Sequence, residues 1–332
     1  MNTSQHNLQG KSILVFILLI IGLIIIVIGS LELLSLLKIK PSLPSPLATR
    51  TEINTISFPR QLKDATGNTL IIPKRPQRIV SQTLGTDEIL LALCPANRIV
   101  AVSTLALNEK YSNVVEKART IPGQTTLNVE HILDLNPDLI FVASYNQAET
   151  IELLQTTGAP VFRFANFNRI DDIKNNIKTI GYAIGEDKRV AALITKMEEE
   201  IKAIRVNFSP LNTQPPRVML YDQWHYTAGS NTLFDDMLQV LGAINVAANQ
   251  GIKGHIKISD EQIIEWQPDF IVTGSHYDKF EEVRRQLREN PTIAVSNVGK
   301  KSGRIIVIDN RHLTAVSQYI IYGIRALAQD LF

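Results

Sequence analysis

The sequence predicts an α/β protein with two Rossmann-like parallel-sheet lobes joined by a long helix and preceded by one N-terminal transmembrane helix. Three observations carry this prediction: a helix–turn–strand stretch that occurs twice, a long amphipathic stretch between the copies, and a charge-free apolar run near the N-terminus. The 332 residues, 45% of them hydrophobic, suffice for about two domains. The net charge of +2 leaves no electrostatic footprint for nucleic acid, so no such partner is expected.

The repeated stretch begins at Asn136 in the first half of the chain and at Gln267 in the second. In each copy, Pro-Asp comes directly after a segment with the pattern of an amphipathic helix. The proline is expected to end that helix, because proline lacks a backbone N–H. The apolar run after Pro-Asp is typical of a strand buried on both faces of a parallel sheet. Each run leads to a serine, Ser144 or Ser275, at the strand end where open α/β sheets bind ligands. The repeat therefore predicts two similar lobes, each with a ligand-facing edge.

The N-terminal run is long enough to cross a membrane. Residues 12–31 carry no charge and the apolar run continues to residue 37 with only Glu32 inside it, whereas about 20 apolar residues span a bilayer core. The run is longer than the hydrophobic region of a secretory signal peptide, and Pro46-Leu47-Ala48 has proline where cleavage needs a small residue. We therefore expect an uncleaved signal-anchor at residues 12–37, with cleavage as the alternative.

The predicted signal-anchor at residues 12–37 determines where the folded part of the chain is expected to lie. Residues 1–11 are assigned to the cytoplasm, and residues 38–56 form a proline-containing tether that reaches about 50 Å at polyproline geometry. The folded part is expected on the periplasmic side of the cell inner membrane, which it would contact through a single-pass helix.

The first lobe is predicted over residues 57–169. It opens with a turn at residues 64–69, where Gly67 and Asn68 supply positive-φ chemistry between two short strands. Apolar runs then predict strands at residues 78–81, 99–102, 139–142 and 161–164, and helices at 86–93 and 147–156. Strands that alternate with helices are the pattern of a doubly wound parallel sheet.

Residues 170–207 are predicted to be connecting helices. Isoleucines at helical spacing mark the first helix, with Gly185 as its C-cap and Asp187 as the N-cap of the next. Apolar residues from Val190 to Ile204, spaced by four and three, mark a second helix over residues 187–207. At about 1.5 Å per residue this helix is roughly 31 Å long, enough for a rod between two lobes.

The second lobe is predicted over residues 208–332 and repeats the plan. Strands are expected at residues 217–221, 270–272 and 304–308, and helices at 233–241, 280–288 and 317–332. The loop at 222–230 is rich in aromatic and polar groups, and the loop at 245–257 is rich in glycine.

Several segments together resemble a known family. They are Asp64–Thr69, Pro76–Ser81 and Thr86–Leu90 with Leu93 in the first lobe, and Thr232–Leu238 with Gly242 and Asn245–Ala247 in the second. They are similar to the periplasmic substrate-binding proteins that serve ABC importers of ferric siderophores, haem and cobalamin, over residues 56–332. The resemblance implies two lobes joined by a rigid helix, a ligand between them, no cofactor, a monomer, and an ABC permease dimer with its ATPase as partner.

Two acids are candidate docking residues. On helical wheels, Glu88 and Asp236 lie far from the apolar faces of their helices, so both are expected to be exposed. The resemblance implies that such acids pair with permease arginines. The alternative is a solvated helix face, and the Asp236 side chain is one methylene shorter than the glutamate usual in the family.

Aromatic residues that follow strands are the main ligand candidates. Trp224 and Tyr226 follow the first strand of the second lobe, and Tyr145 and Tyr277 follow the two repeat copies. Their rings offer large contact areas with polar tips, which suits a bulky chelate, although each could instead be a packed loop residue. The full set of expected ligand-binding residues is Gln82, Thr83, Leu84, Thr104, Lys110, Ser144, Tyr145, Trp224, Tyr226, His255, His276, Tyr277 and Arg311. Lys110 and Arg311 are included because they could neutralise an anionic chelate.

The histidines do not predict a bare-metal site. His225, His255, His276 and His312 all fall in second-lobe loops, whereas the first lobe offers only His131, and metal binding needs ligands that converge. An axial contact to haem or cobalamin, or a hydrogen bond to ligand, stays open for them.

The sequence gives little support for catalysis. It contains no Gly-x-Ser-x-Gly, P-loop, Gly-x-Gly-x-x-Gly or His-Glu-x-x-His motif, and its one cysteine, Cys94, is expected to be a buried small residue. We therefore expect a non-enzymatic, membrane-tethered solute-binding protein that captures a ferric siderophore. Cobalamin or haem is the alternative ligand; a tethered ligand sensor or a chelatase-like enzyme is the alternative class.

Overall fold

The structure is a computed structural model that describes residues 57–126, 128–156, 158–208, 214–300 and 304–332, which belong to one compact unit. The predicted signal-anchor at 12–37 and the tether at 38–56 lie outside these residues. Within the described ranges, no helix combines the length and the apolar character needed to cross a membrane.

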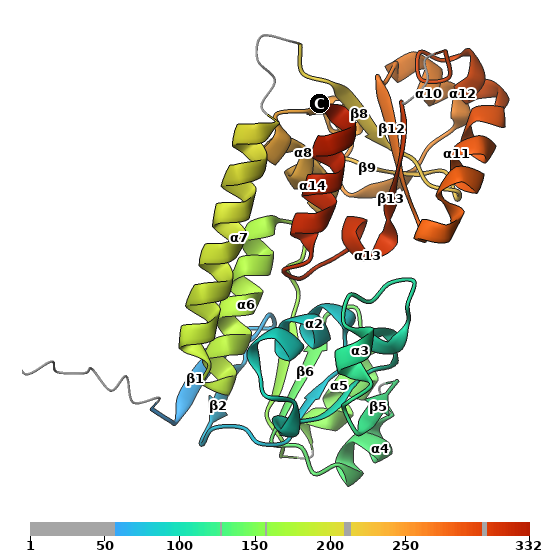
Figure 1. Cartoon of the computed structure of the whole chain (residues 1–332). Coiled ribbons are helices and arrows are strands. Elements are labelled where there is room, and N and C mark those ends of the chain that lie inside the picture. Colours follow the sequence, from blue (N-terminus) through green and yellow to red (C-terminus); the bar gives the residue numbers. More distant parts are fainter. Residues whose placement is uncertain (1–56, 127, 157, 209–213, 301–303) are drawn as a thin grey trace, which may run out of the picture. The chain divides into compact units, whose positions relative to one another are not determined.

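The first lobe is built on a parallel sheet of five strands (Figure 1). Their order is β5 (Gly123–Thr125), β4 (Ile99–Ser103), β3 (Ile79–Ser81), β6 (Leu139–Ala143) and β7 (Val161–Phe164). The helices are α2 (Leu84–Leu93), α3 (Val115–Ala118), α4 (Val129–Asp134) and α5 (Ala148–Gln155), with short 3₁₀ turns at Ala96–Arg98 and Thr104–Leu107. The antiparallel hairpin of β1 (Arg60–Lys63) and β2 (Thr69–Ile72) precedes the sheet, as predicted, and Gly67 has φ 86° in its turn.

The second lobe has a parallel sheet of four strands in the order β10 (Ile244–Asn245), β8 (Arg217–Leu220), β12 (Phe270–Ser275) and β13 (Ile305–Asp309). Its helices are α8 (Leu233–Leu241), α9 (Val246–Asn249), α10 (Asp260–Trp266), α11 (Phe280–Glu289), α12 (Pro291–Val295), α13 (Asn310–Leu313) and α14 (Ile320–Leu331), with a 3₁₀ turn at Tyr277–Lys279. A separate antiparallel ribbon pairs β9 (Tyr226–Ala228) with β11 (His255–Lys257). Both short strands lie in segments that were predicted to be loops, 222–230 and 245–257.

The repeat is confirmed as the same structural device in each lobe. The carboxylate of Asp138 accepts hydrogen bonds from the N–H groups of Gln77 and Arg78, both at 2.8 Å, and that of Asp269 accepts one from the N–H of Arg217 at 3.1 Å. The guanidinium of Arg78 donates to the carbonyls of Leu135 and Asn136, just after α4. That of Arg217 donates to the carbonyls of Trp266 and Gln267 at the end of α10. Each Pro-Asp turn therefore joins the end of a helix to the start of the neighbouring strand, which explains why the motif occurs twice.

In each sheet, the strand of the repeated stretch, β6 or β12, lies next to the point at which the strand order reverses. In the first lobe the chain reverses its direction of strand addition between β3 and β6, and in the second lobe between β8 and β12. Ligands of open α/β sheets bind at the carboxyl ends of such strand pairs. The loops that follow these four strands are therefore the positions at which a site is expected.

The two predicted connecting helices are α6 (Ile170–Ile184) and α7 (Asp187–Asn207). Gly185 ends α6 with φ 73°, as predicted. The expected N-cap of α7 is wrong by one residue: Glu186 is the cap, and Asp187 is the first helical residue, whose carboxylate lies 2.7 Å from Arg60.

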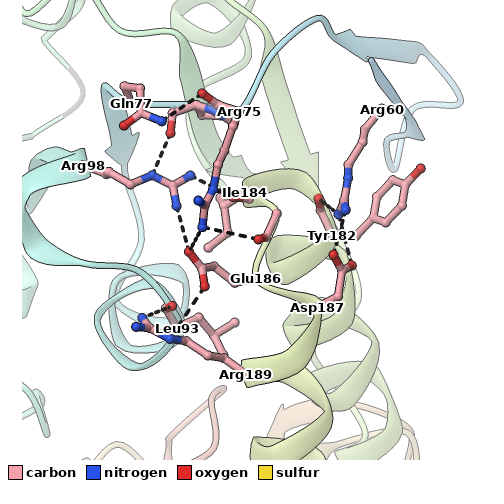
Figure 2. Close-up of polar contacts among 12 residues, drawn as sticks. Arg60, Arg75, Gln77, Leu93, Arg98, Tyr182, Ile184, Glu186, Asp187 and Arg189 are labelled. Atoms are coloured by element: carbon pink, nitrogen blue, oxygen red, sulfur yellow. Dashed lines mark hydrogen bonds and ion pairs between the residues drawn. The ribbon is translucent and has the colours of Figure 1, made fainter. Parts of the chain in front are cut away.

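An arginine cluster fixes the turn between α6 and α7 to the first lobe (Figure 2). The guanidinium groups of Arg75 and Arg98 lie 2.5 and 2.8 Å from Oε1 of Glu186. That of Arg189 lies 3.6 Å from Oε2 of the same carboxylate. Arg98 also donates to the carbonyls of Pro76 and Ile184. Because these partners come from four separate segments, the base of the rod and the first lobe are held together.

Candidate ligand-binding cleft

A cavity of about 690 Å³ lies at the carboxyl ends of β8 and β12. The first lobe contributes Tyr111, Phe167 and Asn168, and the second contributes the loop that follows β8 together with the end of β12. Ligand pockets in proteins are commonly about 300–1,000 Å³ with mainly apolar walls. Here the apolar lining includes Leu220, Phe234, Leu287, Leu313 and Val316.

The loop after β8 holds its aromatic residues in a defined conformation. The carboxylate of Asp222 accepts hydrogen bonds from the N–H groups of Trp224 at 2.9 Å and Tyr226 at 2.8 Å. His225 has φ 65°, a left-handed conformation that non-glycine residues rarely adopt. The indole of Trp224 is 63% exposed and lines the cavity. The backbone of this loop is therefore fixed while its largest ring stays available to a ligand.

Behind this loop lies a hydrogen-bonded group of three side chains. The Tyr221 hydroxyl lies 2.5 Å from Oδ1 of Asp260 and 2.6 Å from Nδ1 of His225, which is itself 3.0 Å from Oδ1 of Asp260. Burial, and then the nearby Asp260 carboxylate, raise the pKa of Tyr221, whereas the hydrogen bond from Tyr221 lowers the pKa of Asp260. No sequence pattern indicates this group, because Asp260 is remote from the other two residues in the chain.

The strand ends of the first lobe are mostly occupied by internal hydrogen bonds. Thr83 caps α2 and lies 2.8 Å from Thr86, and Gln82 is buried with both amide atoms lacking a partner among the described residues. Tyr145 is exposed, with its ring centroid 5.8 Å from that of Phe167. The amide of Gln82 and the exposed ring of Tyr145 are therefore two first-lobe strand-end groups that a ligand could contact.

The predicted ligand-binding residues divide between two cavities and other positions. Trp224 and His255 line the larger cavity, and His276, Tyr277 and Arg311 line a smaller one of about 420 Å³ that also reaches the first lobe. The remaining predicted residues line neither of these two cavities: Gln82, Thr83, Leu84, Thr104, Lys110, Ser144, Tyr145 and Tyr226.

Arg311, expected to neutralise an anionic chelate, already has a carboxylate partner within the chain. Its guanidinium lies 3.0 and 2.7 Å from the two carboxylate oxygens of Asp309 and 5.6 Å from the centroid of the Tyr277 ring. The hydrogen bond to Asp309 raises the pKa of Arg311. Asp309 therefore balances the charge that was expected to neutralise an anionic chelate.

The expectation that Glu88 is exposed is also wrong. Its side chain is buried, accepts hydrogen bonds from the N–H and the amide of Asn113 at 2.9 Å, and accepts another from the hydroxyl of Ser317 in the second lobe. Gln318 donates to the Glu88 carbonyl at 3.0 Å. The wheel of α2 identified the side opposite its apolar face, but the second lobe covers that side.

Asp236 is half-buried rather than exposed. Its carboxylate accepts a hydrogen bond from the N–H of Ile170 at 2.8 Å and lies 3.3 Å from Arg169, so it caps the start of α6. Both candidate docking acids thus have partners within the chain.

Other reactive groups are buried or isolated. Cys94 is buried, as expected, and burial raises its pKa to about 11. Across the described ranges, no three histidine, cysteine or acidic side chains lie close enough to hold a metal ion.

Two curated proteins are similar to this chain over most of its length. An uncharacterized ABC transporter substrate-binding lipoprotein of Bacillus subtilis is 27% identical over 291 residues, which cover 86% of this chain and 89% of that protein. A cobalamin-binding protein of Halobacterium salinarum is 25% identical, with 86% of this chain and 78% of that protein covered.

Solved structures share the two-lobed fold. The periplasmic haem-binding protein RhuT of a Roseiflexus species superimposes with a TM-score of 0.65 at 28% identity, covering 77% of this chain and 97% of that one. A possible iron-binding periplasmic solute-binding protein of Staphylococcus epidermidis has a TM-score of 0.69 at 23% identity, covering 78% and 100%. These likenesses confirm the predicted arrangement of two parallel-sheet lobes.

The family assignment rests on a match to most of the folded unit. A model described as "Periplasmic binding protein" matches residues 79–312, from β3 in the first lobe to α13 in the second. The chain therefore belongs to the periplasmic binding protein family.

Proposed function

We propose that this protein binds a bulky metal chelate outside the cytoplasm and delivers it to an ABC permease. The observation that carries the proposal is the cavity between the lobes, with the exposed Trp224 among its lining residues and both apolar and polar side chains in its wall. The names of the similar proteins support three ligand types, namely iron chelates, haem and cobalamin. Such a task requires a preformed site and no catalytic step.

Replacing Trp224 by alanine is expected to weaken chelate binding by roughly 1–3 kcal/mol, the range for losing a buried aromatic anchor. Calorimetric titration provides the measurement, because the variants lack the Trp224 fluorescence that a ligand can quench in wild type, where the only other tryptophan, Trp266, is buried in the second-lobe core. Ferrioxamine B, ferric haem and hydroxocobalamin are titrated separately into wild type and variant. Trp224→Phe is the matched control, since it keeps a ring at the cleft and is expected to keep most of the affinity. If none of the three probes quenches wild-type fluorescence, the proposal fails.

We further propose that residues 12–37 hold the folded unit at the membrane. The basis is the charge-free run at 12–31 and the absence of a small-residue cleavage site after it. The protein is then expected to fractionate with membranes and to be released when protease cuts within residues 38–56. N-terminal sequencing of the released and unreleased forms distinguishes this from cleavage, because a soluble mature protein that starts near Thr49 contradicts the tether.

A further inference from the structure

Basic side chains gather where the chain enters the folded unit. Segments 60–78 and 182–189, with Arg98 and Asp138 that bond to the first of them, contain eight basic and four acidic residues, a surplus of four positive charges. The whole chain has a net charge of +2, so all its other residues together carry a net charge of −2. The net positive charge of the protein is therefore concentrated at one place in the fold.

The two segments are held together beside the first residue that the structure describes. Nε of Arg60 donates to the carbonyl of Ser57 at 3.2 Å, and Nη2 of Arg60 lies 2.7 Å from Asp187 in the first turn of α7. Arg75, which follows β2, reaches the same turn, because it lies 2.5 Å from Glu186. The hairpin of β1 and β2 and the start of α7 therefore form one surface. We call it the entry surface, and it comprises residues 57–78 and 182–189.

Three lysines lie on the outer side of the entry surface. Lys63, Lys74 and Lys188 are exposed, and none of them is paired with an acid among the described residues. Ile71 is 60% exposed, lies opposite Gln61 in the hairpin, and lines a pocket of about 490 Å³ together with Lys74. An exposed apolar side chain among lysines is typical of a surface that rests on lipid headgroups.

Two arginines of the entry surface add donors for phosphate. Arg75 and Arg189 share the carboxylate of Glu186 with the buried Arg98, so one negative charge faces three positive ones (Figure 2). The side chains of Arg75 and Arg189 are 41% and 53% exposed. Within the described ranges, Nη1 of Arg75 and Nη2 of Arg189 have no hydrogen-bond partner. Because guanidinium groups bind phosphate oxygens through paired hydrogen bonds, the entry surface can bind phosphate groups as well as attract negative charge.

The entry surface lies away from the ligand cavity. Asp138 and Pro160 line the same pocket as Ile71 and Lys74, and they come directly before β6 and β7. This pocket therefore lies at the amino-terminal edge of the first sheet. Phe167, which lines the larger cavity, follows β7 at its carboxyl end. A partner on the entry surface would thus leave the cleft open to ligand.

We propose that the entry surface binds the anionic lipid surface of the membrane and holds the folded unit against the bilayer while it is not on the permease. This inference rests on the proposed function, because a tether at residues 38–56 would keep the surface within reach of the headgroups. A short tether raises the effective concentration of the partner, so that weak binding suffices. The attraction acts within about a Debye length, about 8 Å at physiological ionic strength, so the exposed lysines and arginines would dominate it.

Vesicle flotation after controlled cleavage tests the proposal. A site for a specific protease is inserted between Ala48 and Thr49, and the full-length protein is reconstituted into vesicles of phosphatidylcholine alone or with an equal amount of phosphatidylglycerol. After cleavage in low salt, the folded unit is expected to leave the phosphatidylcholine vesicles and to stay on those with phosphatidylglycerol. NaCl at about 1 M, which screens charges within about 3 Å, is expected to release it. Loss from both vesicle types in low salt overturns the inference and leaves the tether intact.

Charge reversal assigns the retention to particular side chains. Lys74→Glu with Lys188→Glu is expected to lower retention at least about tenfold, because each lysine near an anionic surface contributes about fivefold to binding. Lys202→Glu with Lys257→Glu is the matched control, since both lysines are exposed and Lys202 is about 21 Å further along α7 than Lys188. An equal loss in the two pairs overturns the assignment to the entry surface. Ile71→Ser is expected to weaken retention severalfold without changing its salt dependence, because it removes apolar contact and no charge.

The state before cleavage separates this inference from the proposed tether. Flotation with phosphatidylglycerol vesicles alone overturns the tether and supports the entry surface, whereas flotation with neither kind overturns both. Inorganic phosphate at millimolar concentration provides the last control. Release of the cleaved unit by phosphate, but not by chloride of the same ionic strength, would assign the entry surface to a free anion and overturn the membrane as its partner.

Discussion

Replacing Glu186 by alanine is expected to lower the free energy of unfolding by about 3–5 kcal/mol, the range for removing one partner of a buried ion pair. The Glu186 side chain is 10% exposed and that of Arg98 is 6% exposed, so water cannot replace the carboxylate beside Arg98. In the variant, the buried guanidinium keeps only the carbonyls of Pro76 and Ile184 as partners. Figure 2 shows the three arginines that converge on this one acid.

Urea unfolding followed by circular dichroism measures the effect. Glu199→Ala is the matched control, because Glu199 is an exposed glutamate on the same helix and surface substitutions usually stay within about 0.5 kcal/mol. Glu186→Gln keeps the side-chain length and some hydrogen bonds but removes the charge, so we expect an intermediate loss. If Glu186→Ala and Glu199→Ala unfold at the same urea concentration, the arginine cluster does not fix the rod.

Replacing Glu88 by lysine is expected to destabilise the folded unit by about 3–5 kcal/mol, because it places an unpaired charge in a buried site. The carboxylate of Glu88 accepts three hydrogen bonds from Asn113 and Ser317, and an ammonium group can accept none of them. The backbone N–H and side-chain amide of Asn113 would lose their acceptor. The hydrogen bond from Ser317, which joins the second lobe to α2, would also be lost. Thermal unfolding is the measurement, and Glu152→Lys on the exposed side of α5 is the control.

This burial changes how a docking role for Glu88 can be tested. Burial raises the pKa of Glu88, so the isosteric Glu88→Gln resembles the protonated acid and is expected to unfold within about 1 kcal/mol of wild type. Loss of uptake in Glu88→Gln, with ligand affinity retained, would support docking to permease arginines, whereas unchanged uptake would favour the tethered sensor. A Glu88→Lys variant as stable as wild type would show that the second lobe does not cover α2 in solution.

Much of the fold follows from local chemistry that is visible in the sequence. Proline ended two helices, Gly185 ended a third in a left-handed conformation, and the stripe from Val190 to Ile204 defined α7 with the bounds that the structure gives. Apolar runs of strand length located β6, β7 and β12, since a strand buried on both faces needs no polar residue. The C-terminal helix begins at Ile320 rather than at Ser317, because that serine turns to bond Glu88.

The site depended on contacts between residues that are distant in the chain. Trp224 was expected at a ligand and does line the cavity, because the position of a residue after a strand also gives its place at the sheet edge. His255 lines the same cavity from the ribbon of β9 and β11. The prediction that Glu88 is exposed was wrong, because a helical wheel describes one helix and not the elements that pack against it. Ser317 of the other lobe covers this side of α2. The orientation of His225 by Asp260 could not be predicted either, since no period or spacing connects two loops that meet only when the second sheet is formed. The sequence alone thus determined the elements and the ligand-facing edges, and the packing of the lobes decided which polar groups are free.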